Sequence, residues 1–240
     1  MPLYHTDPNK ILFLDIETVR AADEFQQLDE RWQKLWTNKT RFQRKEEESA
    51  EDFYLKRAAI LAEFGKIVCI SCGFFAIQEG KRVFRVKSFS GDNEKDLLWD
   101  FAEMLRKHFD QSYVLCAHNG KEFDFPYLSR RMVVNGITLP ELLNTSGLKP
   151  WEIRHLDTME MWKFGDYKHY SSVSLLAALF DIPTPKDDID GSMVGEVYWK
   201  EKNLKRIVEY CQKDTVTVAR IFLKMENQAP LKDEEIIIND

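Results

Sequence analysis

Two carboxylates in an apolar strand are the first residues of this chain that could do chemistry. Residues 11–18 read Ile-Leu-Phe-Leu-Asp-Ile-Glu-Thr. Side chains alternate along a strand, so Asp15 and Glu17 should project from the same face. Neighbouring acids in such a strand repel each other and resist desolvation. Two interpretations stay open for this run alone: a divalent cation offsets that cost, or the acids point into water from an edge strand.

Three later stretches also place polar residues where the local pattern is otherwise apolar. Asp124 lies in the first turn of a predicted helix, a position that also suits an acid because of the helix dipole. Tyr210 and Asp214 are one helical turn apart and share a face. Asp157 sits on a short apolar segment, where we expect a local turn role. None of these features is specific on its own.

Taken together and in order, these motifs resemble the DEDD superfamily of 3′–5′ exonucleases, in the branch that uses tyrosine. The residues that match its three motifs are Asp15-Ile16-Glu17, then Asn119-x-x-x-Phe123-Asp124-x-Pro126-Tyr127, then Tyr210-x-x-x-Asp214. The second motif is most similar to the proofreading exonuclease domains of family-B DNA polymerases. The motifs span about 200 of the 240 residues. The resemblance implies a free-standing exonuclease with a ribonuclease H-like fold.

The resemblance also implies a metal centre and a mechanism. Phosphodiester hydrolysis by two Mg²⁺ or Mn²⁺ ions about 3.5–4 Å apart needs oxygen ligands. Asp15 would bridge both ions, Glu17 and Asp214 would hold the ion that activates water, and Asp124 would help to hold the other. Tyr210 would orient the attacking water, because a phenol with a pKa of about 10 is a poor free base.

The same resemblance suggests how the 3′ end of a single strand would be held. Backbone groups near Thr18 and Val19 would meet the terminal sugar. Asn119 and Phe123 would hold the next nucleotide by hydrogen bonding and stacking. His118, at the end of a predicted strand, is a further candidate for substrate binding. The predicted activity is a 3′–5′ exonuclease that releases 5′-mononucleotides. DNA is favoured over RNA as the substrate, but no residue is identified that would read a 2′-hydroxyl, so both stay open. The alternative is a non-catalytic nucleic-acid-binding or accessory subunit with the same fold.

The elements that must position these residues follow from the hydrophobic pattern. A strand at 67–77 and its hairpin partner at 83–89 join the first strand in an antiparallel start, and helices alternate with strands thereafter. The sequence therefore predicts an α/β fold, a mixed β-sheet flanked by helices, as one exonuclease domain over residues 1–227. Residues 228–240 are expected to form an acidic C-terminal tail.

A helical insertion is expected at about 21–64, directly after the first strand. Apolar residues at helical spacing indicate one helix over 23–36, and a capping box at Ser49 indicates a second that runs to about Glu63. Between them, residues 37–45 carry four cations and no acid. This basic loop either guides a phosphate backbone or is an ordinary solvated surface; its cations are Lys39, Arg41, Arg44 and Lys45.

Composition limits the remaining possibilities. Hydrophobic residues make up 44% and charged residues 31%, as in ordinary globular proteins. The net charge of -6 gives no general attraction for nucleic acid, although it allows an acidic metal centre with local basic contacts. No apolar stretch is long enough to span a bilayer, and the N-terminus lacks the features of a signal peptide. Four scattered cysteines suit reduced thiols, so we expect a cytoplasmic protein without membrane contact.

Overall fold

The computed structural model describes residues 6–166, 168–183 and 189–239. Six strands form one sheet in the order β5-β4-β1-β2-β3-β6. The strands are β1 (Ile11–Arg20), β2 (Gly65–Gln78), β3 (Lys81–Ser90), β4 (Val114–Ala117), β5 (Leu156–Asp157) and β6 (Ile236–Asn239). β1, β2 and β3 pair antiparallel, whereas β4, β5 and β6 each join in parallel. This mixed sheet flanked by helices confirms the predicted α/β fold.

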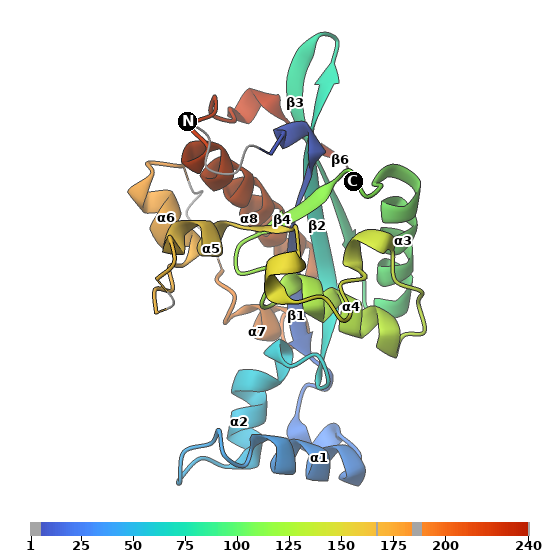
Figure 1. Ribbon diagram of the computed structural model, residues 1–240. Coiled ribbons are helices and arrows are strands. Elements are labelled where there is room, and N and C mark those ends of the chain that lie inside the picture. The colour runs from blue at the N-terminus through green and yellow to red at the C-terminus, as the bar shows by residue number, and fades with distance from the viewer. Residues whose placement is uncertain (1–5, 167, 184–188, 240) are drawn as a thin grey trace.

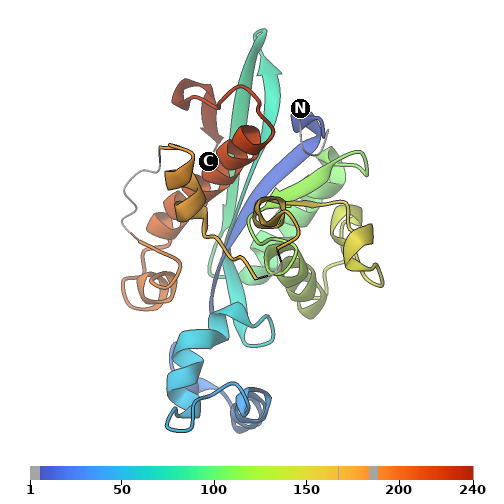
Figure 2. The same cartoon turned by 60° about the vertical axis from the view of Figure 1, so that its left-hand side comes forward.

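Helices cover both faces of the sheet (Figures 1 and 2). They are α1 (Glu30–Thr40), α2 (Ala50–Arg57), α3 (Glu94–His108), α4 (Asp124–Val134), α5 (Thr158–Lys163), α6 (Val173–Leu179), α7 (Val194–Trp199) and α8 (Leu204–Met225). None of the helices within the described ranges combines the length and the apolar character that crossing a membrane requires.

Alternate side chains of β1 point to opposite faces of the sheet and pack against different helices. Leu12, Leu14 and Ile16 are buried against α3 and α4. Ile11 and Phe13 are buried on the other face against α8. Because Asp15 and Glu17 keep the alternation of Phe13, they point toward α8. The strand that carries the two acids is therefore central in the sheet and covered on both faces.

The insertion after β1 forms a helical arm, residues 21–64, that extends away from the sheet (Figure 1). It has its own small core, in which Trp36 and Tyr54 are fully buried. The boundaries differ from the prediction. The first helix begins only after Asp29, whose side chain caps it, and the second ends at Arg57 because the chain must turn into β2. Gly65 begins β2, where a Cβ atom would lie 2.3 Å from the hydroxyl of Tyr127.

The C-terminal segment is not the free acidic tail that the sequence suggested. Ile236–Asn239 forms β6, which pairs in parallel with β3 from Phe84 to Lys87. The Arg82 guanidinium fixes the approach by binding the carboxylate of Glu235, at 3.0 Å. The apolar run Ile236-Ile237-Ile238 is thus the edge strand of the sheet, and the sheet extends beyond residue 227.

Candidate active site

The two carboxylates of β1 lie under α8, largely removed from water. Glu17 is 7% exposed, and Asp15 is half-buried. Within the described part of the chain, the Oδ2 atom of Asp15 is buried without a hydrogen-bond partner. The pairing of β1 with β2 shifts register between Glu17 and Thr18. Such irregularities bend a strand and re-aim its side chains, and they are frequent beside active sites.

The face of α8 that packs on β1 brings a tyrosine, a cysteine and an aspartate to these acids. Tyr210 and Asp214 lie one turn apart, and the phenol of Tyr210 hydrogen-bonds to the carboxylate of Asp214. The thiol of Cys211 donates a hydrogen bond to the backbone carbonyl of Asp15, at 3.3 Å. No pattern in the sequence singles out Cys211, although it adjoins Tyr210 in the third motif.

Asp124 enters the cluster from the first turn of α4. Its side chain is 4% exposed and accepts hydrogen bonds from its own backbone and from that of Ile16. Pairing between β4 and β1 ends at Phe13, so the β4 side of β1 is open where Asp124 approaches. The acid therefore does more than complement the helix dipole, because it contacts the strand that carries Asp15 and Glu17.

The acidic cluster is electrostatically unfavourable without cations. Burial, and then the charges of Glu17, Asp214 and Asp124, raise the pKa of Asp15 well above its usual range. Burial, followed by Asp214, does the same to the pKa of Glu17. Burial also raises the pKa of Asp124 to about 7, against the hydrogen bonds from its own backbone and Ile16. These shifts are expected where acids are arranged to share a positive charge.

The donor set fits hard divalent cations. One ligand atom each from Asp15, Glu17 and Cys211 lies within 4.8 Å of the others. The unpartnered Oδ2 of Asp15 is the kind of buried acceptor that a cation would satisfy. Burial raises the pKa of the Cys211 thiol, so the oxygens are the anionic ligands here. Oxygen ligands of this kind suit Mg²⁺ and Mn²⁺.

Tyr210 is held in its protonated form. Burial, and then the charges of Asp214, Glu17 and Asp15, raise the pKa of its phenol far above the ordinary value. Its hydroxyl is therefore a hydrogen-bond donor at neutral pH and not a base; its role in positioning a water stays a prediction.

Around this cluster, the residues expected to bind substrate lie in different environments. Val19 is fully buried beside α7, so only its backbone could meet a ligand. His118 uses both ring nitrogens, at 2.8 Å from the Thr158 hydroxyl and 2.7 Å from the carbonyl of Ser171. Its burial lowers its pKa, and these bonds favour a positioning role over direct contact.

Thr18, Asn119 and Phe123 stay available for contact. Thr18 and Phe123 are half-buried, and the ring of Phe123 packs 5.3 Å from that of Tyr127. Asn119 adopts a left-handed backbone, with φ of 62°. Its buried Oδ1 has no hydrogen-bond partner among the residues that the structure describes. Substrate contact by these three residues stays a prediction.

Asp157 has a larger role than the local turn that the sequence suggested. It is 3% exposed and caps α5, but its carboxylate also holds the loop that leads to Asp124. It accepts hydrogen bonds from four backbone N–H groups: Asn119 at 2.9 Å, Lys121 at 3.1 Å, Met159 at 2.9 Å and Glu160 at 3.3 Å. Its only visible sequence signal was its place before a short helix.

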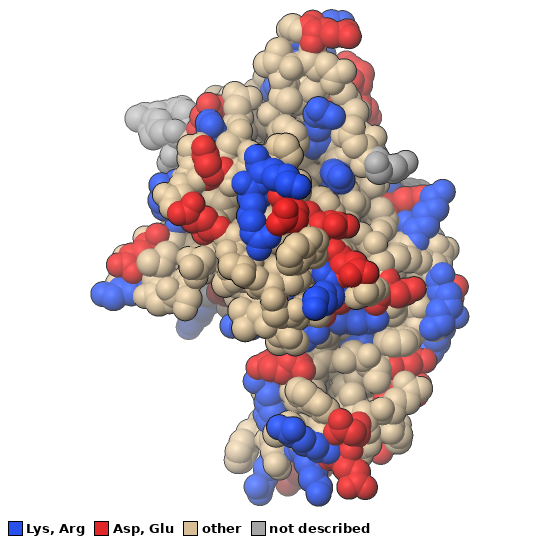
Figure 3. All heavy atoms as spheres, turned by 90° about the vertical axis from the view of Figure 1, so that its right-hand side faces the viewer, with Lys and Arg blue, Asp and Glu red and all other residues tan. Residues whose placement is uncertain are grey.

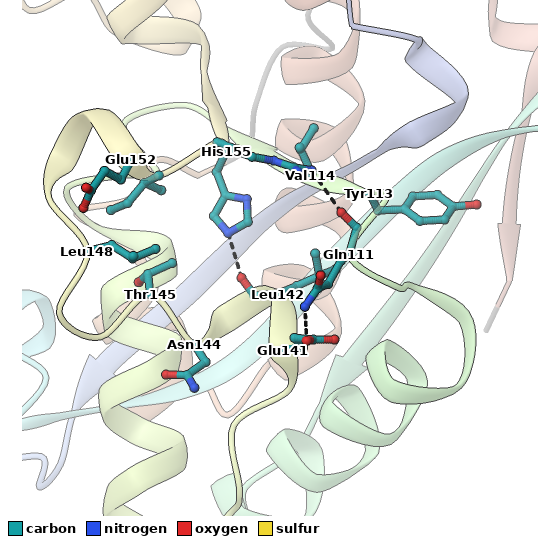
Figure 4. A pocket seen from close by; sticks show the side chains of 12 residues that line it. Gln111, Tyr113, Val114, Glu141, Leu142, Asn144, Thr145, Leu148, Glu152 and His155 are labelled. Atoms are coloured by element: carbon teal, nitrogen blue, oxygen red, sulfur yellow. Dashed lines mark hydrogen bonds between the residues drawn. The ribbon is translucent and has the colours of Figure 1, made fainter.

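A separate cavity of about 210 Å³ lies near the start of β4, at the opposite end of that strand from Asn119 (Figure 4). His155 points into it and donates from Nε2 to the carbonyl of Leu142 at 2.7 Å, while Nδ1 accepts from the Leu115 backbone at 3.2 Å. Burial lowers the pKa of His155 to about 4, so the ring is neutral at pH 7. These contacts are structural and do not form a second catalytic centre.

Surface charge is mixed. On the face shown in Figure 3, Lys and Arg side chains alternate with Asp and Glu without a continuous basic patch. Of the basic loop expected at 37–45, Lys39 lies in the last turn of α1, which runs to Thr40, and pairs with Glu63 at 2.9 Å. In the rest of that loop, Phe42 is 91% exposed with the Arg41 guanidinium 5.5 Å from its ring centre. Both interpretations of this loop, phosphate guide and solvated surface, stay open.

Part of this chain is similar in sequence to DNA polymerases. The chain is 25% identical over 186 residues to a DNA polymerase of Pyrococcus glycovorans and 26% identical over 190 residues to DNA polymerase 1 of Pyrococcus abyssi. These matches cover 68% and 69% of this chain but only 23% and 24% of those proteins. The chain thus spans about a quarter of the length of these relatives.

The fold agrees with a solved structure of the family B DNA polymerase from Pyrobaculum calidifontis. The TM-score is 0.53 at 17% identity, over 93% of this chain and 26% of that one. Residues 59–236 match the family model described as "Predicted 3'-5' exonuclease related to the exonuclease domain of PolB". The match begins after β1, so Asp15 and Glu17 lie outside it. Because it covers most of the chain, the protein belongs to this family of predicted 3′–5′ exonucleases related to the exonuclease domain of PolB.

Proposed function

We propose that this chain is a metal-dependent 3′–5′ exonuclease that removes 5′-mononucleotides from the 3′ end of single-stranded DNA. The observation that carries the proposal is the convergence of β1, α4 and α8 on one buried acidic cluster. Four carboxylates and a tyrosine from these elements interact with one another, as the causes of their raised pKa values indicate. The names of the relatives, all DNA polymerases, favour DNA over RNA.

The charge of the cluster suits two divalent cations. Asp15, Glu17 and Asp214 would hold one, and Asp15 with Asp124 would hold the other. When bound, two such cations lower the pKa of a water nucleophile and offset charge on the attacking and leaving oxygens. The carboxylates carry a formal charge of -4 when ionised, which two divalent cations would balance. Their burial limits contact with bulk water, which would strengthen the interaction of the carboxylates with bound cations.

Tyr210 would act by position. Its hydroxyl is protonated and bonded to Asp214, so it can turn to donate to, or orient, a water beside that carboxylate. The neighbouring Asn119 offers a buried amide oxygen without a partner in the described ranges, which suits a hydrogen bond to a terminal sugar or base. A buried acidic cluster of this kind would select a free end, because a paired end would have to fray before its last phosphodiester could reach the carboxylates.

A 5′-labelled oligonucleotide in Mn²⁺ or Mg²⁺ tests the proposal. We expect a ladder of shortened products that keep the 5′ label, and no ladder in EDTA. Asp15→Asn removes one shared cation ligand and should abolish laddering, whereas Tyr210→Phe should slow it about a hundredfold by loss of one positioned hydroxyl. Trp151→Ala, at an exposed residue of the segment that contributes to the cavity of Figure 4, is the matched control. Laddering that Asp15→Asn leaves intact would exclude the proposed site.

The alternative is a nucleic-acid-binding subunit without turnover. It would bind oligonucleotides tightly yet give no products in either cation. Single- and double-stranded DNA and RNA compared in the same assay would also establish the substrate class.

A further inference from the structure

The connection between α5 and α6 presents two aromatic rings to solvent. Phe164 is 73% exposed and Tyr170 is 67% exposed. The ammonium of Lys163 lies 4.4 Å from the centre of the Tyr170 ring. Large aromatic side chains normally contribute their area to the core, so two exposed rings within seven residues need a reason.

The backbone at Phe164 adds to the cost of this arrangement. Phe164 ends α5 in the left-handed conformation, with φ of 45° and ψ of 36°. This conformation is unusual for a bulky residue. Gly165, which accepts it freely, follows with φ of 89°. The strained residue is thus the one that holds its ring in water, where packing does not stabilise it. Strain of this kind gathers at sites that bind ligands.

The connection is attached to the candidate active site. Ser171, next to Tyr170, is 5% exposed, and its carbonyl accepts the hydrogen bond from His118. His118 immediately precedes Asn119, whose backbone N–H is held by Asp157. The two rings therefore belong to a segment that is hydrogen-bonded, through Ser171, to the residue before the loop that leads to Asp124.

We infer that Phe164 and Tyr170 form a stacking platform for bases of the single strand whose 3′ end lies in the acidic cluster. The inference rests on the proposed function and names how its substrate is held. Every base has a π face, so exposed rings bind single strands without sequence preference. Lys163 and Lys168 outnumber Asp166 on this segment, so its charge complements the phosphates between stacked bases.

Equilibrium binding tests the platform apart from catalysis. The probe is a 5′-fluorescent oligothymidylate of about 12 nucleotides, with a phosphorothioate at its last linkage, in Ca²⁺, which takes the same oxygen ligands. A second probe has abasic sites at every position except the 3′ terminus. The variants are Phe164→Ala/Tyr170→Ala and Phe164→Tyr/Tyr170→Phe, which keeps both rings. Trp151→Ala is the control, because Trp151 is 78% exposed with Lys149 5.4 Å from its ring centre but lies on a different segment.

The alanine pair should bind the thymidylate about tenfold or more weakly, since each lost stack is worth about fivefold or more. It should bind the abasic probe as the wild type does. The ring-preserving pair and Trp151→Ala should bind both probes normally. Equal thymidylate binding by the alanine pair and the wild type would overturn the inference. So would a loss of affinity for the abasic probe as large as that for the thymidylate, or an equally large loss of thymidylate affinity in Trp151→Ala.

Hydrolysis separates this inference from the proposed function. If the wild type is active and the alanine pair leaves its KM unchanged, the exonuclease proposal stands and the stacking platform is refuted. If the wild type has no turnover but the alanine pair binds the thymidylate more weakly and the abasic probe normally, the stacking platform stands and the exonuclease proposal is refuted. With both correct, the alanine pair raises KM about tenfold at nearly constant kcat, because stacking remote from the scissile bond holds ground state and transition state alike.

Discussion

Replacing Asp124 by asparagine should stabilise the metal-free protein while weakening its response to metal. The side chain is 4% exposed, and burial raises its pKa from 3.8 to about 7. At 1.36 kcal/mol per pH unit, ionising this buried acid above pH 7 costs on the order of 4 kcal/mol of folding free energy. Asparagine has nearly the same shape and no charge, but it accepts the hydrogen bond from Ile16 less strongly. We therefore expect a net gain of about 2–3 kcal/mol at pH 8 in EDTA.

The pH dependence of the wild type follows from the same shift. The folded pKa lies above the unfolded one, so between about pH 4 and 7 the folded state binds more protons than the unfolded state. The stability of the metal-free protein should therefore fall as the pH rises through this window. Asp124→Asn removes one part of that slope, and the raised pKa values of Asp15 and Glu17 maintain the rest.

Urea denaturation from pH 4 to 8 measures both effects, in EDTA and then in Mn²⁺. Mn²⁺ should stabilise the wild type, because it binds only the folded site, and should stabilise Asp124→Asn less. Asp100→Asn, at an exposed acid of α3, is the matched control and should match the wild type throughout. A variant that is less stable than the wild type at pH 8 in EDTA, or a wild type that gains stability from pH 4 to 7, would refute the electrostatic reasoning.

Three further predictions test the surroundings of the site. Asp157→Ala leaves four backbone donors unpaired and should lower the free energy of unfolding by about 3 kcal/mol in urea titrations. Asp157→Asn keeps one acceptor oxygen and should cost less; an equal loss would mean that a neutral acceptor cannot replace the charged carboxylate. Glu94→Ala breaks a buried ion pair with Arg131 and should lower the free energy of unfolding by about 3–5 kcal/mol. A melting temperature equal to that of the wild type would contradict this. Neutralising three cations of the basic loop, at 41, 44 and 45, should weaken oligonucleotide binding and lower its salt dependence, by about one counterion for each phosphate that the loop no longer binds. An unchanged salt slope would make that loop an ordinary surface.

Local periodicity was sufficient for the parts of the site that lie within one element. The two-residue repeat of a strand put Asp15 and Glu17 on one face, and the helical repeat did the same for Tyr210 and Asp214. Both relations depend only on the backbone geometry of a single segment. The mixed sheet was predictable for a similar reason, because apolar alternation and the turns that follow it mark each of the longer strands.

Interactions between distant segments had no local signal. β6 pairs with β3 about 150 residues earlier in the sequence, so its four residues look like a tail until the partner strand is present. Asp157 reads as a turn residue because its acceptor role depends on backbone groups 36 and 38 residues away.

The order of amino acids was enough to identify which residues could form an acidic centre, and on which face of a strand and of a helix each lies. That α8 and α4 bury these acids together became visible only in the folded molecule, since electrostatic cost depends on neighbours that are remote in the chain. The same holds for Cys211 against the backbone of Asp15, and for an exposed aromatic pair attached to the edge of the site through His118. Desolvation and exposure are properties of the packed molecule, and a sequence pattern records neither.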